Sequence, residues 1–322
     1  MSPELRDRMI ARRMVALGLA ALLAAVLFMT LGARGNWDFV LPFRGRKLAG
    51  LAMVAVAIAL ATVIFQTVTR NRILTPAIMG FDSLFVLVQT GLVFLFGSAR
   101  LSALDPRLSF AVETLLLCGF AGLLYRWLFG ASQRGLHLLL LVGIVFGTLF
   151  RSSAGLMQRL IDPDEFLVLQ DRLFASFNAV DQDLLGFSAL ILLAVSIALW
   201  RMLPLLDVLA LGRDAAIGLG VDHDRTVAIV LGLMTVLVAV STALVGPVGF
   251  FGLMVANLAY LLLPTTRHAV LLPAAALIAL VALIGGQTIL ERVFDYDTAL
   301  AVVIEFLGGL FFILLVVRGK SR

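Results

Sequence analysis

Three carboxylates lie within otherwise apolar stretches of the chain and are the side chains best placed to do chemistry. They are Asp82, Glu113 and Glu305. A charge inside lipid hydrocarbon costs at least about 2.5–3.5 kcal/mol on insertion scales, so each one needs an explanation. Such a group can hold a proton or a cation, or give a pathway a polar lining. Capping a helix or reaching the interface explains Asp82 and Glu113 as well, because both lie near the start of an apolar stretch. Glu305 lies deeper, and both interpretations stay open for it.

The other reactive side chains indicate neither a metal site nor a nucleophile. His137, His223 and His268 are scattered without ligand partners at helical spacing, and Cys118 is the single cysteine. A metal site or a cofactor bound by this chain is therefore not expected. The C-terminal Gly-Lys-Ser lacks the earlier glycine of a phosphate-binding loop, so any ATP and magnesium must be bound by another subunit. No nucleophile with a base is evident, which argues against an intramembrane enzyme.

Membrane-spanning helices must position these residues. The chain of 322 residues is 61% hydrophobic and 14% charged, with a mean hydropathy of +1.08, whereas soluble domains have about 45–50% apolar and about 25% charged residues. A helix needs about 20 apolar residues to cross a bilayer. The sequence therefore predicts an all-α polytopic membrane protein forming a single domain, 1–322. The ten expected spans are 14–32, 48–68, 78–97, 109–129, 136–156, 186–203, 227–245, 249–264, 271–287 and 298–317.

The basic residues indicate the orientation of the chain. Arg6, Arg8, Arg12 and Arg13 precede the first span, and no small-residue cleavage site is present. Residues 1–13 therefore form a retained cytoplasmic segment. With ten spans, both termini are expected in the cytoplasm and the protein in the cytoplasmic (inner) membrane. The net charge is +5, and the basic residues lie in short segments between the spans. This placement is typical of residues that control topology and does not indicate nucleic-acid binding.

Two polar stretches are expected on the outer side of the membrane. The expected outer loop 33–47 is basic, against the usual bias. The stretch 157–185 mixes acidic residues with leucine and phenylalanine. That mixture predicts a short amphipathic element near the outer interface.

Three motifs stand out from the apolar background. Gln66 closes one span, and Asn71, Pro76 and Gly80 lie in the turn that opens the next. Pro76 interrupts a helix and Gly80 permits an unusual backbone angle. Taken alone, this motif is typical of an ordinary turn.

The second motif runs from Leu211 to Gly220, inside an expected cytoplasmic segment of about 203–225. Ala215, Ala216 and Leu219 give it a small apolar face outside the membrane. Such a face suits a groove on a soluble partner, although packing on its own bundle explains it too. The third motif, Gly246, Pro247 and Gly249, predicts a rigid turn that lets helices approach closely.

In this order and spacing the three motifs resemble the permease subunits of ATP-driven importers for iron chelates and vitamin B12, the FecCD-type family. The similarity runs from about Arg44 to Arg318. There are departures as well: Arg72 stands where proline is usual, and Asn257 and Tyr260 stand where histidine and arginine are common. The stretch from Asn71 to Leu84, together with residues 255–259, resembles the branch of the family that serves ferric siderophores and not vitamin B12.

The resemblance implies a type II importer-like bundle that is not itself an enzyme. A binding protein outside the membrane would deliver the ferric siderophore, and ABC ATPase subunits inside would supply the energy. The membrane unit would pair this chain with a second copy or a paralogous permease, in contact with lipid. The chelate itself, and the choice between homodimer and heterodimer, stay open.

The resemblance also assigns residues to roles. Arg44 and Lys47 would dock the binding protein. Contact with the ATPase would fall to Gly212, Asp214, Ala215, Ala216, Leu219 and Gly220. The pathway would be lined by Gly143, Gly147, Thr148, Glu305, Gly308 and Gly309, although small residues serve close packing equally well. The alternative function is an ion-coupled secondary transporter that uses Asp82 or Glu305.

Overall fold

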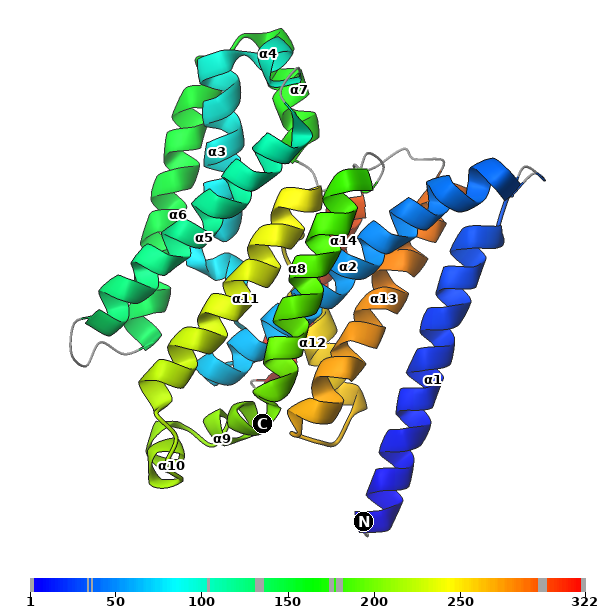
Figure 1. Cartoon of the computed structure of the whole chain (residues 1–322), viewed down its shortest axis with the longest axis vertical. Coiled ribbons are helices and arrows are strands. Elements are labelled where there is room, and N and C mark those ends of the chain that lie inside the picture. Colours follow the sequence, from blue (N-terminus) through cyan, green and yellow to red (C-terminus); the bar gives the residue numbers. More distant parts are fainter. Residues whose placement is uncertain are drawn as a thin grey trace.

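The computed structural model describes residues 3–319, with gaps at 34, 36, 103–104, 131–135, 174–176, 178–181 and 295–299. Helices dominate these residues (Figure 1). In chain order they are α1 (Pro3–Thr30), α2 (Trp37–Thr69), the 3-10 helix η1 (Pro76–Met79), α3 (Phe81–Phe96), α4 (Ser98–Ser102), α5 (Pro106–Gly130), α6 (Leu136–Gln158), α7 (Pro163–Leu173), α8 (Gln182–Arg201), α9 (Leu203–Leu209), α10 (Arg213–Gly218), α11 (His223–Val245), α12 (Phe251–Leu262), α13 (His268–Arg292) and α14 (Leu300–Gly319).

The predicted all-α membrane bundle is confirmed. Within the described residues, seven helices are long and apolar enough to cross a membrane. Three shorter apolar helices, Phe81–Phe96, Phe251–Leu262 and Leu300–Phe311, fall on the remaining expected spans. Residues 298 and 299 of the last expected span lie outside the described part of the chain.

Helix α2 runs through the middle of the bundle and packs against α11, α12 and α13. Its central turns are rich in buried alanine, including Ala55, Ala59 and Ala61. Without a hydrophobic driving force inside lipid, helices associate by close packing, and small side chains permit it. The approach of α12 is so close that a Cβ on Gly252 would lie 2.1 Å from Oγ1 of Thr62.

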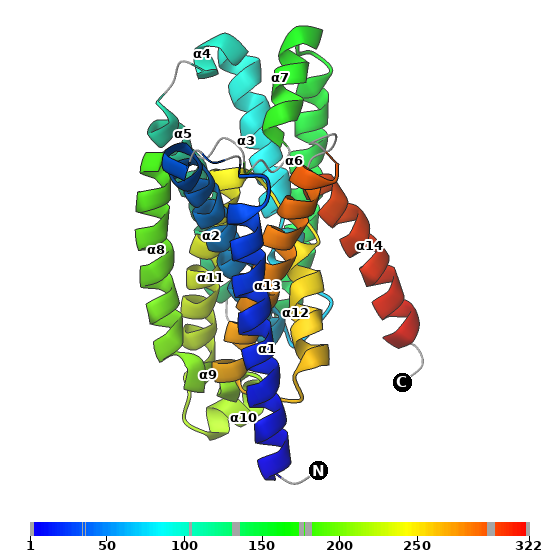
Figure 2. The ribbon, with the colours of Figure 1, turned by 90° about the vertical axis from the view of Figure 1, so that its right-hand side faces the viewer.

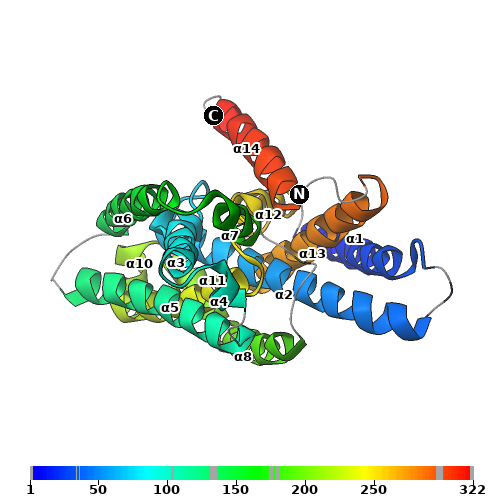
Figure 3. The same ribbon diagram turned by 90° about the horizontal axis from the view of Figure 1, so that it is seen from above.

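The helices fall into two groups around this centre. Helices α3 to α7 gather on one side, and α1 lies at the opposite edge beside α13 (Figure 1). The last helix, α14, leans away from the bundle in both other views (Figures 2 and 3). It contacts α12 and the end of α13, so much of its apolar surface is exposed.

Two expectations for the polar stretches meet different outcomes. The prediction of an outer loop over 33–47 is wrong, because α2 already begins at Trp37 and contains Pro42. Only the turn before Trp37 is non-helical among its described residues. The amphipathic element expected within 157–185 is confirmed as α7, which has acidic residues in its first turn and buries Leu169. The rest of that stretch, 174–176 and 178–181, lies outside the described residues.

Both ends of the chain lie at the same end of the bundle as α10 (Figures 1 and 2). We call this the α10 end. The second motif and the arginines of the first helix therefore occupy one side of the bundle.

Candidate functional site

The second motif forms a short helix, α10, held between two glycines with left-handed backbone. Gly212 has φ 104° and Gly220 has φ 82°, a region that favours glycine over all other residues. Gly212 also packs tightly, since a Cβ there would lie 2.8 Å from Nη1 of Arg70. Both glycines of the motif are therefore required by the shape of the segment.

The side chains of this segment divide into a buried and an exposed set. Ala216 is completely buried, so its side chain is not available to a partner, contrary to the expectation from sequence. Leu219 is 62% exposed, together with Leu211 at 60% and Ile217 at 53%. These three side chains lie beyond the end of the bundle. We call Leu211, Ile217 and Leu219 together the coupling surface. The sequence analysis named neither Leu211 nor Ile217 as a candidate contact residue, although both are exposed at this end of the bundle.

The coupling surface is anchored to the start of α11. The guanidinium of Arg213 donates to Asp224 at 3.1 Å, and the carboxylate of Asp222 caps α11 by accepting from the backbone N–H of Arg225 at 3.2 Å. Asp214 and Ala215 lie exposed on the same helix. These contacts fix the direction in which α10 presents its apolar side chains.

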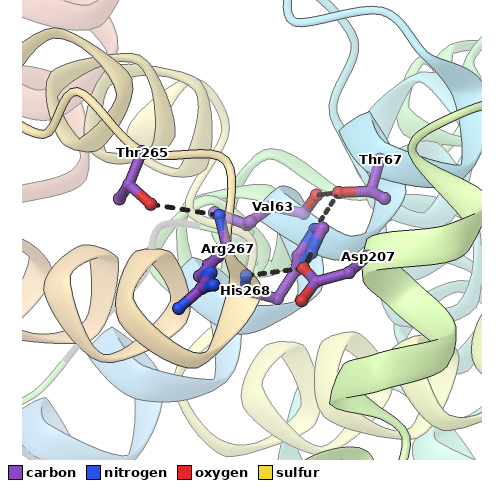
Figure 4. A network of polar contacts seen from close by, with 6 residues as sticks. All are labelled: Val63, Thr67, Asp207, Thr265, Arg267 and His268. Atoms are coloured by element: carbon purple, nitrogen blue, oxygen red, sulfur yellow. Dashed lines mark hydrogen bonds and ion pairs between the residues drawn. The ribbon is translucent and has the colours of Figure 1, made fainter. Parts of the chain in front are cut away.

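A polar network joins α9, α13 and α2 (Figure 4), and α9 also contacts α10. Oδ1 of Asp207 accepts from Nδ1 of His268 at 2.6 Å and from the backbone N–H of His268 at 2.8 Å. Nε2 of His268 lies 2.7 Å from Oγ1 of Thr67, whose hydroxyl is also 2.9 Å from the carbonyl of Val63. A displacement of α9 is therefore passed by hydrogen bonds to the first residue of α13 and the last turns of α2.

This set could not be predicted from sequence, because 61 and 201 residues separate its bonded members. Its order of hydroxyl, imidazole and carboxylate is that of a nucleophilic triad. Here, however, Thr67 and His268 are 8% and 2% exposed, and the hydroxyl faces its own helix. A substrate has no access to such a hydroxyl, so the arrangement positions helices.

We expect Asp207→Ala to lower the free energy of unfolding by about 1–3 kcal/mol, because it leaves two donors on buried His268 unpaired. Asp207→Asn keeps an acceptor and should cost less than half as much. The control is Asp214→Ala, an exposed aspartate at the same end, for which we expect about 0.5 kcal/mol or less. Unfolding in mixed detergent micelles measures all three, and equal losses at positions 207 and 214 would contradict the role of the network.

A second link ties the turn after α2 to α12. The backbone carbonyl of Arg72 accepts from Nε2 of Gln66 at 2.8 Å and from Nδ2 of Asn257 at 3.0 Å. The guanidinium of Arg72 lies 4.4 Å from the ring centroid of Tyr260, in cation–π contact. Three of the positions at which the sequence departs from the family pattern, Arg72, Asn257 and Tyr260, therefore meet in space; Ala256 and Leu310 are further departures.

The rest of the first motif shapes the entry to α3. Asn71 accepts from the backbone N–H of Ile73 at 2.9 Å, which stabilises a tight turn. Pro76 begins η1, and Gly80 ends it with φ 89°. That left-handed residue lets α3 start in a new direction.

Two glycines expected in the pathway serve close packing inside the chain. A Cβ on Gly143 would lie 2.8 Å from Cα of Met79, and one on Gly147 would lie 3.3 Å from Cα of Gly80. Both glycines are buried, so the Gly-x-x-x-Gly face of α6 lies on η1. The sequence left open room for a bulky chelate or close packing between subunits; the structure shows these two glycines in close packing within the chain. Thr148 is exposed and bonds only its own helix, through the carbonyl of Ile144.

The expected pathway residues on α14 also divide into tightly packed and open positions. Gly308 packs on α12, since a Cβ there would lie 2.6 Å from Cβ of Phe250, whereas nothing lies within 4 Å of a Cβ on Gly309. Glu305 is exposed, and its Oε1 lies against Gly249. Gly246, with φ 97°, and Pro247 form the turn that brings Gly249 there.

The two other carboxylates have different surroundings. Asp82 and Gly249 line a small cavity of about 20 Å³, so Asp82 and Glu305 both border the turn after α11. Glu113 is buried and accepts from Nε2 of Gln89 at 2.7 Å. Groups of three or more potential metal ligands are not found among the described residues.

The residues expected to dock a binding protein are engaged within the chain. Lys47 is buried and forms an ion pair with Glu291 on α13. Arg44 donates to the carbonyls of Phe28, Met29 and Leu31 at 2.8–3.1 Å, which caps the C-terminal end of α1. The expectation that Lys47 meets an external partner is therefore corrected: its ammonium is an internal link between α2 and α13.

Comparison with known proteins agrees with this architecture. The model of the FecCD transport family matches residues 12–318. The petrobactin import system permease protein YclO of Bacillus subtilis is 48% identical over 284 residues, covering 88% of this chain and 90% of that protein. The petrobactin import system permease protein FatC of Bacillus anthracis is 33% identical over 310 residues, covering 96% and 88%.

A solved inward-facing conformation of a metal-chelate type ABC transporter shares the fold. Its TM-score is 0.83 at 22% sequence identity, over 95% of this chain and 99% of that chain. At this level of identity the likeness concerns the fold alone. The sequence match across nearly the whole length shows the family directly: the chain belongs to the FecCD transport family.

Proposed function

We propose that this chain is the membrane-spanning subunit of an ABC importer that carries a ferric siderophore inward. The observation that supports this most strongly is the 48% identity, over 88% of the chain, to a protein named as a petrobactin import permease. Petrobactin is accordingly the first cargo to test. The inner-membrane orientation proposed above places the α10 end in the cytoplasm, because Arg6, Arg8, Arg12 and Arg13 lie there.

We further propose that the coupling surface docks a separate ATPase that hydrolyses ATP with magnesium. Exposed apolar side chains outside the membrane are stabilised by a partner groove. The contact set becomes Leu211, Ile217 and Leu219, with Asp214 and Ala215 beside them. Movement of α10 would then reach α13 and α2 through Asp207 and His268.

The proposed path lies beside α14, where a second permease completes it. The exposed side chains of α14 include Phe306, Leu310 and Ile313, and the helix stands away from its own bundle (Figure 2). Thr148, Glu305 and Gly309 stay in the proposed pathway. Gly143, Gly147 and Gly308 hold its walls. A binding protein would meet the outer end near Arg44 without using Lys47.

Uptake of radioactive iron–petrobactin into proteoliposomes tests the function. The complete transporter with its binding protein should import the chelate only when ATP is supplied on the α10 side. The ion-coupled alternative predicts uptake that an ionophore abolishes and that needs no ATP. Transport driven by an ion gradient alone would overturn the proposal.

We expect the double variant Ile217→Glu, Leu219→Glu to lose ATP-driven uptake by at least about tenfold, because buried apolar contacts dominate interfaces of this kind. Both side chains are more than half exposed, so the bundle should still fold. Leu5→Glu, which changes an exposed leucine at the same end, is the matched control. Co-purification of the ATPase measures binding separately, and its undiminished recovery with the double variant would contradict the contact.

A further inference from the structure

A cavity of about 720 Å³ lies between the N-terminal turns of α1 and the loop that joins α12 to α13. That volume is in the range of small-molecule binding sites. Residues of α1, α12, the loop and the first turns of α13 line it, together with Arg72 from the turn after α2. The transport cycle described above uses none of this space.

The cavity is positively charged. Three arginines line it, Arg6, Arg72 and Arg267. Asp7 is the one acidic residue among the described residues of the lining, which leaves a net charge of +2. The carboxylate of Asp7 lies 3.8 Å from Nε of Arg6, but the two side chains are 72% and 53% exposed. An ion pair so open to water neutralises little of the field.

Neighbouring contacts position the side chain of Arg72 and the backbone of Arg267. Arg72 lies over the ring of Tyr260, which also lines the cavity. The backbone N–H of Arg267 donates to Oγ1 of Thr265 at 3.2 Å. In Figure 4 the guanidinium of Arg267 points away from Asp207 and its network. The loop therefore turns this charge toward the cavity and not into the polar network beside it.

The cavity adjoins a stretch of α1 whose apolar side chains are exposed. Above it on α1, Val15, Leu19 and Leu23 are 58–63% exposed, as expected for a helix that faces acyl chains. The apolar Ile10 also lines the cavity. In the sequence of α1 it lies between Arg6 and Val15, the first of those exposed residues. Viewed from above and from the front, α1 and α10 lie on opposite sides of the bundle (Figures 1 and 3), so the proposed ATPase contact is remote.

We propose that this cavity binds the phosphate-bearing headgroup of an anionic phospholipid of the cytoplasmic leaflet. Arg6, Arg72 and Arg267 meet the phosphate, because guanidinium groups match its geometry and charge. Ile10 and the exposed face of α1 accompany the acyl chains. The site rests on the orientation proposed above and is independent of the cargo.

The site has a route to the moving parts of the bundle. The backbone carbonyl of Arg72 is the acceptor shared by Gln66 and Asn257. A headgroup that immobilises the Arg72 side chain therefore also stabilises the link between α2 and α12. Anionic lipid acts here as a ligand of one particular turn, beyond its general role as solvent.

Native mass spectrometry of the complete transporter, released from nanodiscs of mixed phosphatidylglycerol and phosphatidylcholine, tests the site. Wild type should retain phosphatidylglycerol in preference to phosphatidylcholine. The variant Arg6→Gln, Arg267→Gln should lose at least about tenfold of this preference, because it removes charge-assisted hydrogen bonds to the phosphate. The control, Arg8→Gln with Arg12→Gln, removes the same charge from α1 outside the cavity, at two residues that line a separate hollow together with Arg13. If the cavity holds the lipid, this control should change retention less than twofold.

Three outcomes would overturn the proposal. One is an equal loss in the control, which would show a diffuse electrostatic effect. Another is displacement of the lipid by millimolar inorganic phosphate, which would make this a site for soluble anions. The third is retention that appears only without the ATPase, which would make the ATPase the occupant. Photo-crosslinking with a headgroup-labelled phosphatidylglycerol needs no variant, and it should label residues 263–270 of the wild-type protein even if the double variant fails to fold.

Discussion

Glu291→Ala is expected to lower the free energy of unfolding by about 3–5 kcal/mol, because it strands a positive charge inside the bundle. The side chains of Lys47 and Glu291 are both 6% exposed and form an ion pair. Glu291 also accepts from Nε2 of Gln287 at 2.8 Å. Removing the carboxylate takes the ion-pair partner at position 291 from the buried ammonium of Lys47. It also takes a hydrogen-bond acceptor from the buried amide of Gln287. Unfolding of the purified chain in mixed micelles measures the loss.

Two controls separate this charge effect from loss of packing. Lys47→Met combined with Glu291→Met should unfold within about 1 kcal/mol of wild type or be more stable, because well-packed apolar residues often replace a buried pair at no cost. Asp224→Ala breaks the ion pair with Arg213, and both side chains of that pair are more than half exposed. It should lower the free energy of unfolding by about 1 kcal/mol or less. A double variant as unstable as Glu291→Ala would refute this account.

Gly143→Leu is expected to destabilise the bundle by about 3 kcal/mol, at the upper end for overpacking. A Cβ at this position would already lie 2.8 Å from Cα of Met79. Because the obstacle is backbone, no rotation of a side chain relieves it, and α6 must move away from η1. The yield and thermal stability of the detergent-solubilised chain report the change.

The same helix supplies the control for this variant. Gly155 is also on α6, but nothing lies within 4 Å of a Cβ built there. Gly155→Leu should therefore leave stability within about 0.5 kcal/mol of wild type. If both variants behaved alike, the effect would come from a general loss of small residues in α6 and not from the contact with Met79.

The spans could be predicted from sequence because hydrophobic length alone decides whether a helix crosses a bilayer. The start of α2 could not, because the polar residues around Arg44 and Lys47 look like a loop until their partners are known. Arg44 holds the end of α1, and Lys47 finds Glu291, far along the chain. A charged segment whose partners lie on distant helices has no local signature.

The candidate site was predictable in outline only. The glycines flanking α10 mark its position, but the sequence cannot tell that Ala216 faces inward while Ile217 faces outward, since a helix of this length shows less than two full turns of periodicity. The network of Asp207 and His268 could not be predicted for the same reason as the ion pair of Lys47, because its partners lie on distant helices. Arg72 and Tyr260 both depart from the family pattern, and they meet in space, but their contact could not be read from a single sequence.

The two ties between α2 and α13 lie at opposite ends of the pair. Lys47 holds Glu291 at one end, and Thr67 meets His268 at the other. Helices fixed at both ends cannot slide or rotate past each other without breaking a buried polar contact, so α2 and α13 form one rigid body. The hinges of the transport cycle must then lie outside this pair. The freest element is α14, which is held by its neighbours at one end only and can swing relative to the central pair, while that pair moves as a unit.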